Sequence, residues 1–140
     1  MDGNKGEFIM FEMKKEYFTG IELIDREHHQ LFDYANQIYE LLHAEFVPDK
    51  YDNIVDILEK LRNYTKQHFA DEEAYMESIH YKKIFTQKIQ HQAFIEELDK
   101  FDLDSISEVE NQEEVIEKML LFVTDWLKVH ILELDTQIGK

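Results

Sequence analysis

The chain contains no cysteine, one proline and four glycines among its 140 residues. Without cysteine, no thiolate is available as a metal ligand or as a nucleophile. Any metal-binding or catalytic chemistry must therefore use nitrogen and oxygen atoms. The scarcity of proline and glycine leaves few natural breaks along the chain.

Basic side chains are also scarce, since 15 lysines and arginines stand against 31 acidic residues, a formal net charge of −16. This charge repels nucleic acid and anionic membrane surfaces, which makes a polyanion-binding role unfavourable. The N-terminal segment has only a short apolar run, Phe8 to Phe11, which fits neither a signal sequence nor a membrane span. These features predict a cytoplasmic protein with no nucleic-acid partner and no membrane insertion.

Apolar residues make up 44% of the chain, which excludes wholesale disorder, and 140 residues are enough for one domain with a real core, residues 1–140. They recur at alternating spacings of three and four in four segments, the pattern of amphipathic helices. The four stripes are Ile24, His28, Leu31, Ala35, Ile38 and Leu42; Ile54, Ile57, Leu61, Thr65, His68, Glu72 and Tyr75; Ile84, Gln87, His91, Phe94, Leu98 and Phe101; and Val115, Met119, Phe122, Trp126 and His130.

This pattern predicts an all-α fold, an antiparallel up-down-up-down four-helix bundle over residues 20–140. Residues 1–19 are expected to form an extended N-terminal arm. Its aromatic residues available to pack over the bundle are Phe8, Phe11, Tyr17 and Phe18. Three helix-start signals are present: Thr19 with Glu22 as a capping box, Pro48-Asp49 before the second helix, and Asn111 with Glu114 before the fourth.

Polar side chains interrupt these stripes at comparable depth in all four helices. They are His28, His68, Glu72, Gln87, His91 and His130. One histidine on an apolar face is more often a hydrogen-bonded core residue than a ligand. Six such groups pointing into one interior would each cost roughly 2–7 kcal/mol if unsatisfied. A metal centre removes that penalty, so the set as a whole indicates metal binding.

The spacing of these residues supports ligation. His68 and Glu72 are four residues apart and share one helical face, and Gln87 and His91 repeat the arrangement. Asp135 follows His130 by five residues, which on a regular helix turns it roughly 140° away. Asp135 can therefore converge on the centre only if the helix loosens near Leu132 to Leu134.

The number of candidate ligands favours two metal ions with shared carboxylates. Four histidines and two carboxylates exceed one tetrahedral zinc, and so many imidazoles do not suit magnesium or calcium. Imidazole with carboxylate suits iron, zinc, copper or nickel, so the ligands alone do not name the element. A centre rich in histidine and poor in carboxylate favours binding over oxidation chemistry.

Four sequence stretches resemble the bacterial hemerythrins: GIELIDREHHQLF at 20–32, HFADEEAYM at 68–76, KIQHQAF at 88–94 and DWLKVHILELD at 125–135. The resemblance covers all four helices in order. It implies a non-haem centre of two iron ions with an oxo or hydroxo bridge that binds O2 reversibly, without enzymatic turnover. The implied ligands are His28 and His68 on the O2-binding iron, Glu72 and Asp135 as bridges, and His91 and His130 on the second iron. The implied apolar lining of the O2 pocket is Phe69, Trp126, Leu127 and Ile131.

Two positions depart from the family pattern. The family places histidine where this chain has Gln87, which could coordinate weakly through its carbonyl oxygen or leave the position to water. Met13 stands where the family often has tryptophan. His29, His43 and His80 are expected to be surface residues and not substitute ligands.

Three other functions remain open at this stage. The chain could be a di-iron enzyme acting on peroxide or nitric oxide at an iron opened by Gln87, with small anions also gaining access. It could be a sensor of O2 or iron. It could also be a metal-free interaction bundle, which the buried polar groups disfavour.

Overall fold

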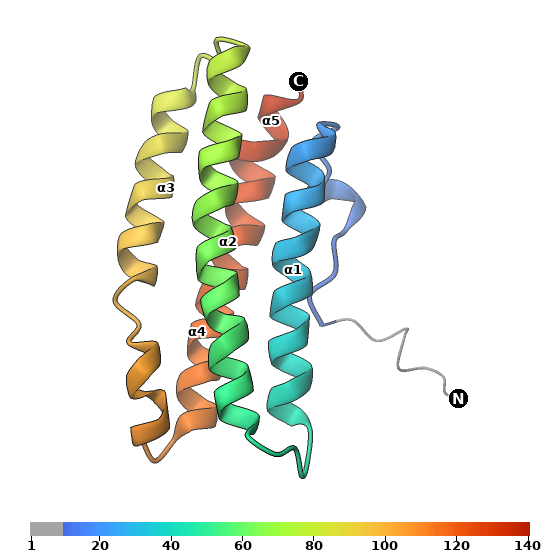
Figure 1. Cartoon of the computed structure of the whole chain (residues 1–140). Coiled ribbons are helices and arrows are strands. Elements are labelled where there is room, and N and C mark those ends of the chain that lie inside the picture. The colour runs from blue at the N-terminus through green and yellow to red at the C-terminus, as the bar shows by residue number, and fades with distance from the viewer. Residues whose placement is uncertain (1–9) are drawn as a thin grey trace, which may run out of the picture.

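Four long helices dominate the computed structural model, which describes residues 10–140 (Figure 1). They are α1 (Glu22–His43), α2 (Lys50–Ser78), α3 (Ile84–Leu98) and α4 (Gln112–His130). A π-helical turn, Ile131–Asp135, joins α4 to the short helix α5 (Thr136–Ile138), and two 3-10 helices lie at Lys15–Tyr17 and Leu103–Glu108. No strand occurs between residues 10 and 140. The prediction of an all-α fold is confirmed.

Consecutive helices run in opposite directions, so that α1 and α3 descend in the view of Figure 1 while α2 and α4 ascend. Helix α1 packs against α2 and α4, and α2 packs against α3. This is the up-down-up-down bundle that the four stripes predict. The π turn and α5 lie at the same end of the bundle as the start of α1. Among the described helices, none is both long and apolar enough to cross a membrane.

The predicted stripe of α1 is correct at every position, because all six of its residues are buried. In α2 the stripe is correct at five positions, while Ile57 and Tyr75 are half-buried beside the buried Leu58 and Met76. In the third stripe, four residues from Gln87 to Leu98 are buried. Phe101 is half-buried beyond the end of α3.

The buried face of α4 differs from the face that the sequence pattern predicted. Met119 and His130 are buried, but Val115, Phe122 and Trp126 are only half-buried. The core positions that the stripe missed are Ile116, Leu120, Val123, Thr124 and Leu127. Apolar residues cover more than one face of this helix, so their period does not determine which face meets the other helices.

The segment before α1 lies along that helix (Figure 1) and is held by two kinds of contact. The backbone N–H of Phe11 donates to Asn36 Oδ1 at 2.8 Å, and Asn36 Nδ2 donates to the Phe11 carbonyl at 2.8 Å. Tyr17 is buried and stacks on Phe32. Phe18 is 51% exposed, so its predicted packing on the bundle is wrong, and Phe8 lies outside the described residues.

Asp25 organises the start of α1 in place of the predicted capping box. Its Oδ1 accepts hydrogen bonds from the backbone N–H and the hydroxyl of Thr19, both at 2.8 Å, and its Oδ2 accepts from Gly20 N–H. Gly20 adopts φ +87°, a conformation that favours glycine. The capping pair of Thr19 and Glu22 is therefore wrong, because a carboxylate one turn into the helix reaches back instead.

The other two start signals are at the correct positions. Helix α2 begins at Lys50, directly after Asp49, and α4 begins at Gln112, directly after Asn111. Asn111 does not cap the backbone with its side chain; its Nδ2 instead donates to Glu114 Oε2 at 3.4 Å.

Candidate metal centre

The bundle brings together the six side chains that the sequence analysis selected as metal ligands. All six are buried: His28 from α1, His68 and Glu72 from α2, His91 from α3, His130 from α4 and Asp135 from the π turn. They form two overlapping groups, each able to present one nitrogen or oxygen per residue within 4.8 Å of the others. The groups are His28, His68, Glu72 and Asp135, and Glu72, His91, His130 and Asp135. Both carboxylates are therefore shared, as the sequence analysis expects of bridging residues.

The nitrogen-to-oxygen distances match the spacing of atoms around a metal ion. His28 Nε2 lies 3.0 Å from Asp135 Oδ2, and His68 Nε2 lies 3.7 Å from Glu72 Oε2. In the second group, His91 Nε2 lies 3.1 Å from Glu72 Oε1 and His130 Nε2 lies 3.1 Å from Asp135 Oδ1. Two atoms bound at about 2.1 Å to one ion are about 3–4 Å apart at ordinary coordination angles.

The π-helical turn places Asp135 in the centre. Five residues separate it from His130, so a regular helix would carry the carboxylate away from the imidazole. The wider turn at Ile131–Asp135 absorbs one extra residue and returns Asp135 to the inner face. The predicted loosening of this helix near Leu132 to Leu134 is confirmed.

Three further side chains, none of them predicted from the sequence, orient the histidines. Glu27 Oε1 lies 2.8 Å from His68 Nδ1, Glu73 Oε2 lies 2.8 Å from His91 Nδ1, and Gln90 Oε1 lies 3.0 Å from His130 Nδ1. Each acceptor holds the proton on Nδ1 and turns the Nε2 lone pair toward the centre.

These contacts follow one pattern around the bundle. Each orienting residue is the sequence neighbour of a candidate ligand on its own helix, and it contacts a histidine on the next helix along the chain. The corresponding neighbours of His130 are Val129 on α4 and Ile131 in the π turn, and neither has a polar side chain. His28 Nδ1 has no hydrogen-bond partner. The adjacency of Glu27 to His28 and of Glu73 to Glu72 was the signal in the sequence that could have identified them.

The two shared carboxyl groups differ in acidity. Burial and the negative charge of Asp135 hold the pKa of Glu72 well above its ordinary value. Burial also acts on Asp135, but the adjacent imidazoles of His130 and His28 outweigh it and lower the pKa of Asp135. Two carboxylates this close cannot both ionise cheaply without a cation between them. A metal ion supplies that positive charge.

Two of the imidazoles are made less basic by their surroundings. Burial, followed by repulsion from His28, lowers the pKa of His68 well below its ordinary value. Burial also lowers the pKa of His91, although its contact with Glu73 opposes the shift. A neutral imidazole is the form that ligates metal, because its free nitrogen lone pair is the donor.

Several buried polar atoms at the centre have no hydrogen-bond partner. They are both ring nitrogens of His28, both carboxylate oxygens of Glu72, and Gln87 Oε1. Nitrogen and oxygen atoms of neighbouring side chains lie close to these unpaired atoms, but the angles between them do not suit hydrogen bonds. An unsatisfied buried polar group costs about 1–3 kcal/mol. Oxygen and nitrogen atoms that converge without bonding one another fit a site built for metal ions.

Gln87 is buried beside the second group and contacts Asp135. Its Nε2 donates a hydrogen bond of 3.0 Å to Asp135 Oδ1, and its Oε1 is unpaired. The amide therefore supports the carboxylate from the position where the sequence resemblance expects an additional histidine.

An aromatic cluster packs on the second group. Phe69 stacks on His91 with ring centroids 3.9 Å apart, and Trp126 stacks on His130 at 4.4 Å. Phe69 also lies edge-on to Trp126 at 5.6 Å. Leu127 and Ile131 are almost completely buried in the same core. The four residues proposed as an apolar lining thus lie together, with the two rings directly against His91 and His130.

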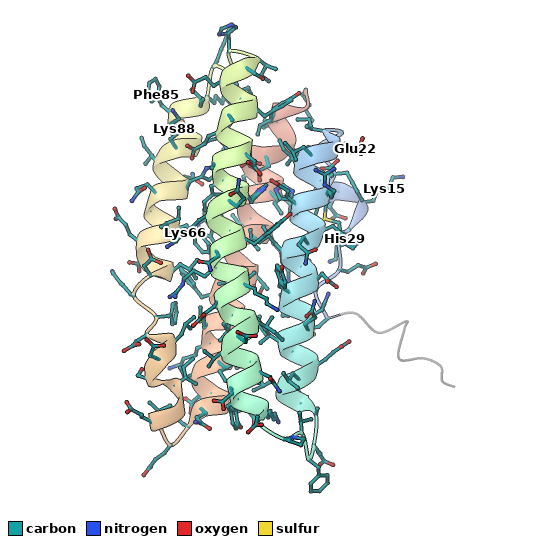
Figure 2. The ribbon with its side chains drawn as sticks, viewed as in Figure 1. Lys15, Glu22, His29, Lys66, Phe85 and Lys88 are labelled. Carbon is teal, nitrogen blue, oxygen red and sulfur yellow. The ribbon has the colours of Figure 1, made fainter. Side chains whose placement is uncertain are left out.

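The remaining histidines lie outside the centre, as expected. His29, His43 and His80 are exposed, and Figure 2 marks His29 on α1. None of the three belongs to either group of converging side chains.

Comparison with known proteins agrees with this geometry. The sequence profile of the Hemerythrin HHE cation binding domain matches residues 19–139. A bacteriohemerythrin from Clostridium acetobutylicum is 47% identical over 128 residues, which cover 91% of this chain and 98% of that protein. A bacteriohemerythrin from Campylobacter jejuni is 31% identical over 119 residues, 85% of each chain. The chain belongs to the hemerythrin family of HHE cation-binding domains.

Proposed function

We propose that this chain holds two iron ions in the buried centre and binds O2 reversibly, for carriage, storage or delivery. The proposed ligands are His28 and His68 for one ion, His91 and His130 for the other, and Glu72 and Asp135 as bridges. The observation that carries the proposal is the pair of four-residue groups that share both carboxylates. Membership of the hemerythrin family supports iron over the other metals that suit these ligands.

The iron pair, when bound, supplies the electrons and the open position that reversible O2 binding requires. The protein supplies orientation and charge. Glu27, Glu73 and Gln90 keep the proton of three histidines on Nδ1, so that each Nε2 remains free to bind. The two carboxylates offset the positive charge of the two ions.

Exclusion of water is the second contribution of the protein. Leu127 and Ile131 are nearly inaccessible to solvent, and Phe69 is 2% exposed. Together with Trp126, these side chains are the proposed lining of the O2 site. An apolar lining keeps proton donors and water away from bound O2 and slows its loss by oxidation. Binding can then be reversible.

Reconstitution with ferrous iron under anaerobic conditions tests the proposal. The protein is expected to retain two irons per chain and to show an absorption spectrum that changes on adding O2 and returns when O2 is removed. Retention of two irons with an irreversible change would contradict reversible binding. Failure to retain iron would contradict the proposed centre as well.

A di-iron enzyme acting on peroxide or nitric oxide is the second candidate. The observation that favours it is Gln87, whose amide contacts Asp135 and leaves one oxygen unpaired where a stronger ligand is expected. Steady consumption of peroxide or nitric oxide by the iron-loaded protein, lost in Gln87→His, would favour this enzyme over a carrier.

A further inference from the structure

A pocket of about 310 Å3 lies between the end of α2 and the start of α3. Met76, which is fully buried, marks its inner limit, while Tyr81 and Ile84 are half-buried in its wall. Phe85 and Lys88 line its exposed side, and Figure 2 shows both on the upper part of α3. The pocket thus leads from solvent toward the bundle interior.

The inner limit of the pocket is one helical turn from the candidate centre. Met76 follows Glu72 by four residues on α2, and Ile84 precedes Gln87 by three residues on α3, so the two steps are roughly 6 Å and 4.5 Å along the helices. Burial and then the charge of Asp135 raise the pKa of Tyr81, which places this side chain within electrostatic reach of the centre. Met76 and Ile84 are thus the pocket residues nearest in sequence to Glu72 and Gln87.

The charge around the pocket differs from that of the molecule as a whole. Residues 78–95 contain three lysines and neither aspartate nor glutamate, in a chain of net charge −16, and Glu77 is the one carboxylate that lines the pocket. Lys88 lies 4.0 Å from Glu77, a contact at the limit of an ion pair, and is 43% exposed. Because the remaining surface repels anions, the mouth of this pocket is a favourable place for one to approach.

The Gln87 side of the metal centre, beyond the inner limit of this pocket, offers a position for a small ligand. Gln87 is 1% exposed, its Oε1 is unpaired, and its Nε2 is occupied by Asp135. An amide is a neutral and weaker metal ligand than imidazole, so the metal held by His91 and His130 has, like the other metal, only two histidines and the two shared carboxylates as strong protein ligands.

We propose that small inorganic anions enter through the pocket between α2 and α3 and bind on the Gln87 side of the metal centre. This inference rests on the proposed di-iron function. Lys88 attracts the anion at the mouth, and Met76, an unbranched and flexible side chain, moves to admit it past Ile84. Gln87 is expected at the metal held by His91 and His130, whereas O2 is proposed to bind the metal held by His28 and His68.

Azide is a suitable probe because it is small, anionic and gives a charge-transfer band on ferric iron. Iron-loaded, oxidised protein is titrated with azide to obtain the number of ions bound, and the rate of each binding phase is then measured by rapid mixing. The wild-type protein is expected to bind two azide ions per chain and Gln87→His one, because imidazole fills the additional position.

Two variants test the route. One phase of azide binding should be present in wild type and absent in Gln87→His. Lys88→Gln should slow this phase about threefold at low ionic strength, and the difference from wild type should vanish in high salt. Lys66→Gln is the matched control, since Lys66 is 41% exposed, pairs with Asp99 and lies outside the pocket. Ile84→Trp should slow the same phase at every salt concentration by narrowing the pocket.

The outcomes separate this inference from the proposed function. Two azide ions bound to Gln87→His would overturn the second binding position. Equal rates of this azide-binding phase in Lys88→Gln and Lys66→Gln, together with no effect of Ile84→Trp, would show that anions do not enter through this pocket. Either result in protein that retains two irons leaves the proposed centre intact. Protein that retains no iron overturns both.

Discussion

Replacement of Glu72 by glutamine separates the role of its charge from the role of its shape. In the metal-free protein, burial and then the negative charge of Asp135 raise the pKa of Glu72 well above its ordinary value, which favours the neutral carboxyl group. Glutamine has nearly the same shape as this neutral acid. The free energy of unfolding of metal-free Glu72→Gln is therefore expected to lie within about 1 kcal/mol of the wild-type value.

The iron-loaded proteins should differ much more. A ligand that binds only the folded state stabilises it by about 2.7 kcal/mol at one hundred times its dissociation constant. Two such ions contribute about 5 kcal/mol, which corresponds to an increase in Tm of roughly 15 °C for a chain of this size. Glu72 belongs to both groups of converging side chains, so Glu72→Gln weakens both sites at once. Most of the increase in Tm should disappear.

Thermal unfolding followed by circular dichroism, with and without ferrous iron under anaerobic conditions, measures this effect. His29→Ala is the control, because His29 is next to His28 in sequence but exposed. It should keep the full iron-dependent increase in Tm. An equal increase in Glu72→Gln and wild type would refute the assignment of Glu72 as a shared ligand.

Three further outcomes follow from other parts of the structure. Burial and a hydrogen bond with Asp71 raise the pKa of Glu27 to about 8, so folded Glu27 holds a proton that the unfolded chain releases above pH 4.5. Urea unfolding of the metal-free proteins should show the stability of wild type falling relative to that of Glu27→Gln as pH rises from 4.5 to 8. Gln87→His should slow removal of one of the two irons by a chelator, whereas two identical release curves would make Gln87 a passive core residue. Gly139→Ala should lower the free energy of unfolding by about 1–3 kcal/mol, because the added Cβ would lie 1.9 Å from the Thr19 carbonyl oxygen; unchanged stability in denaturant would show that this end of the bundle adjusts freely.

The sequence was sufficient to predict the bundle because its helices follow a regular apolar period. It predicted the buried face of α1 correctly, since all six stripe residues are buried. It failed for α4, where adjacent apolar residues such as Leu120 and Leu121 leave the buried face undetermined. The rotation of such a helix depends on contacts with other helices, which a period within one helix does not contain.

The convergence of the site residues was also partly predictable. Polar residues at core positions of four helices must meet inside the bundle, and the five-residue gap to Asp135 required the wider turn that the structure contains. The orienting contacts of Glu27 and Gln90 were not predicted, because they join different helices. The start of α1 was misassigned for a related reason, since both Glu22 and Asp25 are acidic and only the path of the backbone selects Asp25.

The iron content and optical spectrum of protein reconstituted with ferrous iron test the central claim most directly. We expect close to two irons per chain, near-ultraviolet charge-transfer bands of a bridged ferric pair after oxidation, and a reversible spectral change when O2 is added to the reduced protein and removed. One tightly bound zinc per chain, with no such bands after iron loading, would contradict the account.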